Sequence, residues 1–125
     1  MRNWVVLGVV ALLAHPALAQ SPDGRYVGPG RGENAGGQAL QTCPDFDTEV
    51  TVSAGKISGE GRRTVLKNRT VSAERVPLSG EVSPDGKVTM RIWNRRFMGT
   101  LSGGQLVATF LSNECNYRFT LARAG

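Results

Sequence analysis

The class of fold follows from residues 76–93, which read VPLSGEVSPDGKVTMRIW. The central Ser83-Pro84-Asp85-Gly86 is typical of a tight turn, because proline presets φ and glycine accepts a positive φ. On either side of this turn every second residue faces the same way, as in a strand with one buried face. The residues that share this face are Leu78, Gly80, Val82, Val88, Met90 and Ile92. We therefore predict a β-hairpin whose second strand runs from Lys87 to Trp93.

The same alternation extends over most of the chain after Cys43. It is found in residues 49–53 and 115–121, and tight turns are expected at residues 54–56 and 102–105. No stretch has the period of an amphipathic helix. About seven or eight short strands fit an all-β domain, either a small antiparallel up-and-down barrel or a sandwich. The succession of hairpins favours the barrel.

Two segments are exceptions to the strand pattern. Residues 28–41 are rich in glycine and poor in apolar side chains, so a Gly-rich loop is expected there. Residues 61–75 mix a few apolar residues with several arginines, a pattern of either a twisted hairpin or a long basic loop.

The first nineteen residues have the pattern of a cleaved signal peptide. Met1-Arg2 provides a positive start, an apolar run follows, and Ala17-Leu18-Ala19 has the small residues that signal peptidase requires. Roughly ten apolar residues are too few to span about 30 Å of hydrocarbon. Cleavage is expected between Ala19 and Gln20, which leaves one exported domain, residues 20–125, in the periplasm or the medium.

The remaining chain has two cysteines, Cys43 and Cys115. In an oxidising compartment such a pair usually forms a disulfide. The rival interpretation is a metal site, but two thiolates do not complete a zinc shell and the single histidine, His15, belongs to the signal peptide. A bond between the two cysteines would join the end of the chain to its beginning and help to close the barrel.

Several catalytic arrangements are excluded by composition. Without histidine in residues 20–125, Ser–His and Cys–His mechanisms are absent, and no Ser-x-x-Lys motif occurs. Asp45, Asp47 and Glu49 could face one side of a strand and bind Ca²⁺, but no glycine turn of the Ca²⁺-binding type follows them. The pattern instead indicates a solvated strand edge. We expect no enzymatic activity, no metal and no cofactor.

Basic and aromatic residues gather in the second half of the chain. The formal net charge is +5, and between positions 62 and 96 nine basic residues stand against three acidic ones. If the strand from Lys87 continues regularly, Arg91, Trp93 and Arg95 share its polar face, where guanidinium groups can stack on the indole. The candidate binding residues are Arg62, Arg63, Arg91, Trp93, Arg95 and Arg96.

Turns and glycines also carry a resemblance to known proteins. The segments 23–28, 78–80, 83–88, 99–103 and 115–121 together resemble small exported proteobacterial proteins of unassigned function. The meander also looks faintly like avidin- or lipocalin-type barrels, but their characteristic Gly-x-Trp at the first strand is absent, and Tyr26 stands near its place. The resemblance implies a periplasmic setting and assigns no functional residue.

Together these patterns favour a non-catalytic binding module of the bacterial cell envelope. Its expected partner is an envelope protein, or an anionic glycan or lipid headgroup, and not a nucleic acid, because an exported protein rarely meets one. One alternative is an enzyme inhibitor that acts through the Gly-rich loop of residues 28–41. Another is a carrier that holds a small ligand in a barrel cavity.

Overall fold

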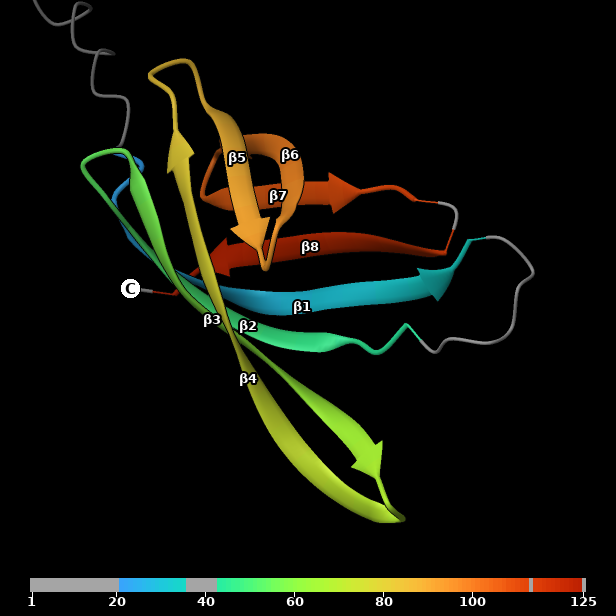
Figure 1. Ribbon diagram of the computed structural model, residues 1–125. Coiled ribbons are helices and arrows are strands. Elements are labelled where there is room, and N and C mark those ends of the chain that lie inside the picture. Colours follow the sequence, from blue (N-terminus) through green and yellow to red (C-terminus); the bar gives the residue numbers. More distant parts are fainter. Residues whose placement is uncertain (1–20, 36–42, 113, 125) are drawn as a thin grey trace, which may run out of the picture.

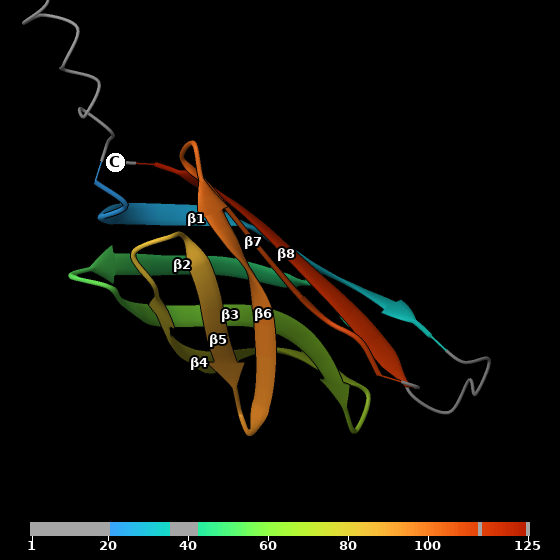
Figure 2. The ribbon, with the colours of Figure 1, turned by 90° about the horizontal axis from the view of Figure 1, so that it is seen from above.

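The computed structural model describes residues 21–35, 43–112 and 114–124. Each strand pairs antiparallel with the next, and the last pairs with the first, so that the sheet closes into an up-and-down barrel (Figure 1). Figure 2 shows β1, β2 and β3 side by side from above. The all-β prediction is confirmed, and the barrel is the observed arrangement. The strands are β1 (Gly24–Asn34), β2 (Phe46–Ser53), β3 (Lys56–Lys67), β4 (Thr70–Val82), β5 (Lys87–Ile92), β6 (Arg95–Ser102), β7 (Gln105–Phe110) and β8 (Cys115–Arg123).

The predicted signal peptide, residues 1–19, lies outside the described residues. In the part of the chain that is described, no helix has the length and apolar character needed to cross a bilayer.

The barrel interior is filled by the alternating apolar side chains. Phe119 is fully buried, and its ring centroid lies 5.2 Å from that of Phe97 and 5.8 Å from that of Phe46. The described strands therefore enclose a packed core. Its other members include Tyr26, Val50, Val52, Ile57, Val76, Leu78, Val88, Met90, Ile92, Leu106 and Leu121.

The hairpin predicted at residues 83–86 is confirmed. The Ser83 N–H donates to the Lys87 carbonyl at 2.9 Å, and Gly86 has a φ of 87°. The flanking strands pair with Val82 opposite Val88, so the inward phase that the alternation predicted is maintained across the turn.

The Gly-rich loop predicted over residues 28–41 is wrong in its first half. Residues 28–34 belong to β1, and residues 36–42 lie outside the described residues. The glycines provide room for neighbouring groups: a Cβ on Gly30 would lie 2.4 Å from the Phe119 ring, and one on Gly28 would lie 2.2 Å from the Thr120 carbonyl oxygen. A stretch without apolar side chains is thus a strand because its partners cover it.

The two longest strands extend beyond the barrel as a two-stranded arm. The pairing of β2 with β3 ends at Asp47 and Arg62, and the pairing of β4 with β5 ends at Leu78 and Ile92. Beyond these limits, residues 63–67 of β3 pair only with β4, and residues 70–77 of β4 pair only with β3 (Figure 1). We call residues 62–77 the arm. Of the two structures left open for residues 61–75, the hairpin is the observed one.

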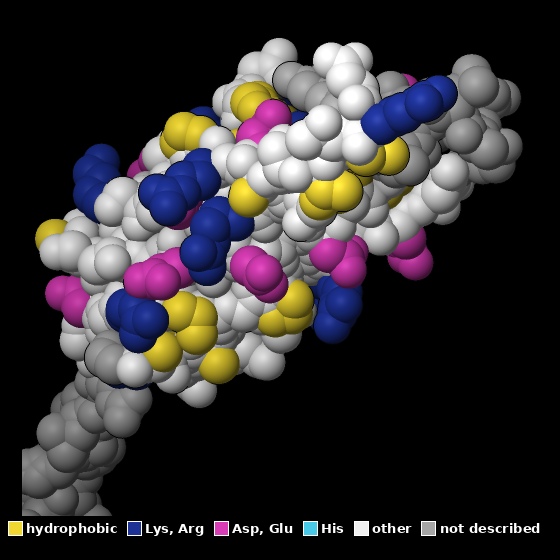
Figure 3. Space-filling view, turned by 90° about the horizontal axis from the view of Figure 1, so that it is seen from below, with side chains coloured by type: hydrophobic (Ala, Val, Ile, Leu, Met, Phe, Trp, Pro, Cys, Tyr) yellow, Lys and Arg dark blue, Asp and Glu magenta, His cyan; other side chains and the backbone are white. Residues whose placement is uncertain are grey.

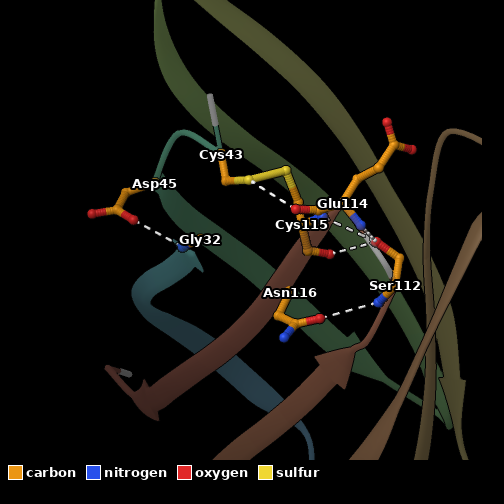
Figure 4. The surroundings of a disulfide bond; sticks show 7 residues. All are labelled: Gly32, Cys43, Asp45, Ser112, Glu114, Cys115 and Asn116. Atoms are coloured by element: carbon orange, nitrogen blue, oxygen red, sulfur yellow. Dashed lines mark hydrogen bonds between the residues drawn. A yellow bond between two sulfur atoms is a disulfide. The ribbon is translucent and has the colours of Figure 1, made fainter. Parts of the chain in front are cut away.

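The predicted disulfide joins Cys43 to Cys115, with 5.6 Å between their Cα atoms (Figure 4). It connects the segment that leads into β2 with the first residue of β8. Beside it, the Ser112 hydroxyl donates to the Cys115 carbonyl at 2.8 Å and accepts from the Glu114 N–H at 3.1 Å. Such a bond is compatible with an oxidising compartment.

Candidate functional site

The six predicted binding residues do not lie on one face. Strand β5 ends at Ile92, and the chain reverses at Trp93 and Asn94. Ile92 is buried and is the register partner of Arg95. Register partners lie on the same face of a sheet, so Arg95 belongs to the inward face of the barrel wall and Arg91 to the outward face. The expectation that Arg91, Trp93 and Arg95 share a polar face is therefore wrong, because the turn comes before Trp93 can continue the alternation.

Trp93, Arg63 and Arg95 lie instead at the barrel end from which the arm extends. The Arg63 guanidinium carbon lies 4.8 Å from the Trp93 ring centroid and 5.7 Å from that of Phe46. The Phe46 ring is in edge contact with Trp93 at 6.4 Å and with Tyr117 at 5.7 Å. We call these five residues the opening cluster. Cation–π stacking of this kind orients both the guanidinium and the indole.

A small cavity lies within the opening cluster. Its volume is about 110 Å³, well below the roughly 300–1,000 Å³ of sites that hold drug-sized ligands. It therefore suits one small polar group. Its walls are formed by Phe46, Arg63, Ile92, Trp93, Arg95, Phe97, Cys115 and Tyr117.

Several wider hollows lie in the described part of the molecule, and none of them is lined by a tryptophan. The two widest of these are at a barrel end and on the outer wall. One of about 430 Å³ is at the opposite barrel end, where Arg123 already donates to the Tyr26 hydroxyl at 2.8 Å. The other, of about 450 Å³, lies on the outer wall, where Arg31 is paired with Asp45 at 3.3 Å. In each an arginine is already engaged and no tryptophan is present. We therefore place the candidate site at the smaller cavity.

Arg62, Arg91 and Arg96 lie on the outer wall. Arg91 donates two hydrogen bonds to Glu81, at 2.8 and 3.1 Å, and these hold the pKa of the Glu81 carboxyl below its usual value. Arg91 is thus occupied by a partner of its own chain. On the face seen in Figure 3, basic and acidic side chains are interspersed with apolar ones, so this face carries no uniform basic patch.

Arg63 and Arg95 differ in the charges around them. The Arg63 guanidinium lies 2.6 Å from a Glu74 carboxylate oxygen on the neighbouring strand. Arg95 lies over the Phe110 ring at 5.5 Å, and among the residues that the structure describes no ion pair involves it. Arg95 therefore brings an unneutralised charge to the rim of the cavity.

Phe46 and Tyr117 were not among the predicted site residues. Both have the inward phase of their strands, and both are next to a strand end at the opening. Inward phase at a strand end is the sequence signal that identifies a residue at the mouth of a barrel. Applied to β6, the same signal selects Arg95.

Burial raises the pKa of Tyr117 above its ordinary value of 10, more strongly than the positive charges of Arg63 and Arg95 lower it. Above pH 10 the unfolded chain therefore loses this proton before the native protein does, and the free energy of unfolding falls as the pH rises. We expect the melting temperature to decrease over this range, and Tyr117→Phe to show a smaller decrease. Equal slopes in the two proteins would contradict the assignment.

The backbone at Trp93 has a φ of 56°, in the left-handed region that side chains other than glycine rarely occupy. Strain of this kind costs about 1 kcal/mol or more. Trp93→Gly relieves it and loses ring contacts worth about 1 kcal/mol. We therefore expect a change in unfolding free energy of less than about 1 kcal/mol, measured by urea denaturation. A decrease of several kcal/mol in the unfolding free energy would mean that the indole stabilises the fold.

Comparisons with known proteins give no relative. The chain matches no protein-family model, and no curated protein or solved structure shows significant similarity to it.

Proposed function

We propose that this protein is a non-catalytic binding module of the bacterial cell envelope that binds an acidic segment of another envelope protein at the opening cluster. One observation carries the proposal: a half-exposed tryptophan stacks on Arg63, in a cavity whose rim also holds Arg95. The turn itself accounts for the positive φ, because Ala54, Asn68 and Arg69 have it in the equivalent two-residue turns. The support for binding is the exposed indole, which is stacked on a guanidinium beside the cavity.

The chemistry of the cavity favours an anionic group. Aromatic walls lower the local dielectric, which strengthens the attraction of a carboxylate to the two guanidinium groups. Glu74 offsets the charge of Arg63 but not that of Arg95. A side-chain carboxylate also fits the small volume.

The surroundings favour a protein over a lipid or a glycan as the source of that carboxylate. Trp, Tyr and Arg are the residues most enriched at the energetic centres of protein interfaces. The adjacent arm also exposes two large apolar side chains, Leu66 at 70% and Val71 at 68%. The predicted signal peptide and the disulfide support the envelope as the setting.

The two alternative functions find less support. An inhibitor that inserts the Gly-rich segment into an enzyme would have residues 28–34 free. In the structure, residues 28–30 pair with β2 and residues 30–34 pair with β8. A carrier would need space inside the barrel, but its interior positions are occupied by the core side chains.

Fluorescence titration of the mature protein tests the proposal, because Trp93 is the single tryptophan in residues 20–125. The probe is a terminally blocked peptide of about ten alternating Glu and Thr residues, long enough to cover a strand. It should change the Trp93 emission at low salt and bind more weakly at physiological salt, where charges are screened beyond about 8 Å.

Two variants of equal charge separate the site from the net charge. Arg95→Gln should weaken the binding of the Glu-Thr peptide about threefold to fivefold, the effect of losing one exposed ion pair. Lys56→Gln, at the opposite end of β3, should leave the affinity unchanged. Equal affinities of both variants, or binding independent of salt, would contradict the proposal, as would a stronger response to vesicles of anionic lipid.

A further inference from the structure

We propose that the acidic segment binds as an added β-strand along the free edge of β4 in the arm; this inference rests on the proposed function. Within the described residues, β4 pairs with β5 only from Leu78 onward, and no strand pairs with its other eight residues on that side, 70–77. A free strand edge presents unpaired backbone donors and acceptors, to which an extended peptide can add.

The direction of the backbone groups along this edge follows from the ladder. The Val82 N–H donates to the Gly55 carbonyl, on the side of β3. Backbone groups of a strand alternate in direction, so those of Val71, Ala73 and Arg75 point away from β3. Pro77 has the same phase but no N–H, and the available hydrogen-bonding stretch is therefore Val71 to Arg75.

The free edge leads directly to the opening cluster. Strand β5 runs alongside β4 as far as Ile92, opposite Leu78, and then turns away at Trp93. A strand added to residues 70–77 would lie on the same side of β4 as β5 and would continue in line with it. One end of it would then lie beside Trp93 and Arg95, and the edge and the cavity would form one continuous site.

The charge of the arm identifies the occupant as acidic. Arg62 and Arg75 are register partners on the outward face, and like charges in this position are unfavourable. Two carboxylates relieve this in part: Asp47 is the register partner of Arg62 on β2, and Glu60 lies 3.6 Å from Arg75. Five basic residues against Glu74 give the arm a formal charge of four positive, which opposes pairing with a second copy of the chain. The basic residues are Arg62, Arg63, Lys67, Arg69 and Arg75.

The exposed apolar pair on the arm adds a second requirement. Leu66 and Val71 are register partners near the tip and are both largely exposed. An isolated two-stranded hairpin is marginally stable in water, so a third strand that covers this pair would also stabilise the arm. We therefore expect a partner segment that is extended and acidic, with an apolar residue beside Val71.

Proline at position 73 tests the backbone contact. Ala73→Pro removes an N–H that points to the free edge and leaves the bonds between β3 and β4 in place, as proline on an edge strand does. It should weaken the binding of the Glu-Thr peptide about tenfold, measured by Trp93 fluorescence. Ala73→Val retains the N–H and should bind as the natural protein does. Circular dichroism checks that both variants retain the barrel.

Charge reversal provides a second test that does not alter the backbone. Arg75→Glu, on the free edge, should reduce the affinity for the same peptide at least tenfold. Arg96→Glu, on the outer wall of β6, should reduce it less than twofold. If Ala73→Pro and Arg75→Glu bind normally while Arg95→Gln is weakened, strand addition is wrong and the opening cluster alone binds the peptide. If the peptide binds neither the natural protein nor any of the variants, both proposals fail.

Discussion

Replacing Cys43 and Cys115 with alanine is expected to lower the free energy of unfolding by about 4 kcal/mol. The two cysteines are 72 residues apart, and on the chain-entropy model a loop of this length restricts the unfolded chain strongly. For a domain of this size the melting temperature should fall by roughly 20 °C. Alanine is the replacement of choice because Cys115 is buried.

Thermal and urea unfolding of the double variant measure this effect. The natural protein in the presence of a reductant serves as the control and should unfold at the same temperature as the double variant. A loss of less than about 1 kcal/mol would contradict the prediction. It would show that the pairing of β1 with β8 closes the barrel without the covalent bond.

Phe119→Ala is expected to cost about 3–5 kcal/mol, because it removes a fully buried ring that contacts Phe46 and Phe97. The same ring fills the space above Gly30, where a Cβ would lie only 2.4 Å from it. Gly30→Val alone should therefore cost about 1–3 kcal/mol through overpacking.

The two substitutions should compensate when they are combined. In the Gly30→Val, Phe119→Ala double variant, the new side chain occupies part of the cavity that the ring leaves. The double variant should then be more stable than the sum of the single losses predicts, by about 1 kcal/mol or more. Additive losses in urea unfolding would mean that the glycine and the ring are not a packing pair.

The strands with one buried face could be predicted from their alternation. Residues 49–53, 87–92 and 115–121 have the inward residues that the pattern indicates. The disulfide could be predicted from composition, since the whole sequence has only two cysteines. In these cases the signal is local or compositional, and the structure adds only the register.

The strand in residues 28–34 could not be predicted, because its evidence lies on other strands. Glycine has no side chain to alternate, and Gly30 is part of a strand since Phe46 and Phe119 pair with it on either side. For the same reason the sequence pattern placed a loop where the barrel has a continuous strand.

The candidate site was predicted in part. Trp93, Arg63 and Arg95 meet at the opening, but the pattern assigned Trp93 to a continuing strand, because nothing in Ile92-Trp93-Asn94-Arg95 has the glycine that a two-residue hairpin usually requires. The left-handed backbone at Trp93 became visible only in the structure. Ala54, Asn68 and Arg69 have the same kind of backbone in the other two-residue turns, so the turn geometry requires it.

Amide hydrogen exchange, followed by nuclear magnetic resonance, tests the central claim most directly. The N–H groups of Val71, Ala73 and Arg75 should exchange fast in the free protein, since they point away from β3. On addition of the Glu-Thr peptide they should become protected, together with a shift of the Trp93 indole resonance. Saturating peptide that leaves these three amides in fast exchange and the indole resonance unmoved would contradict the account.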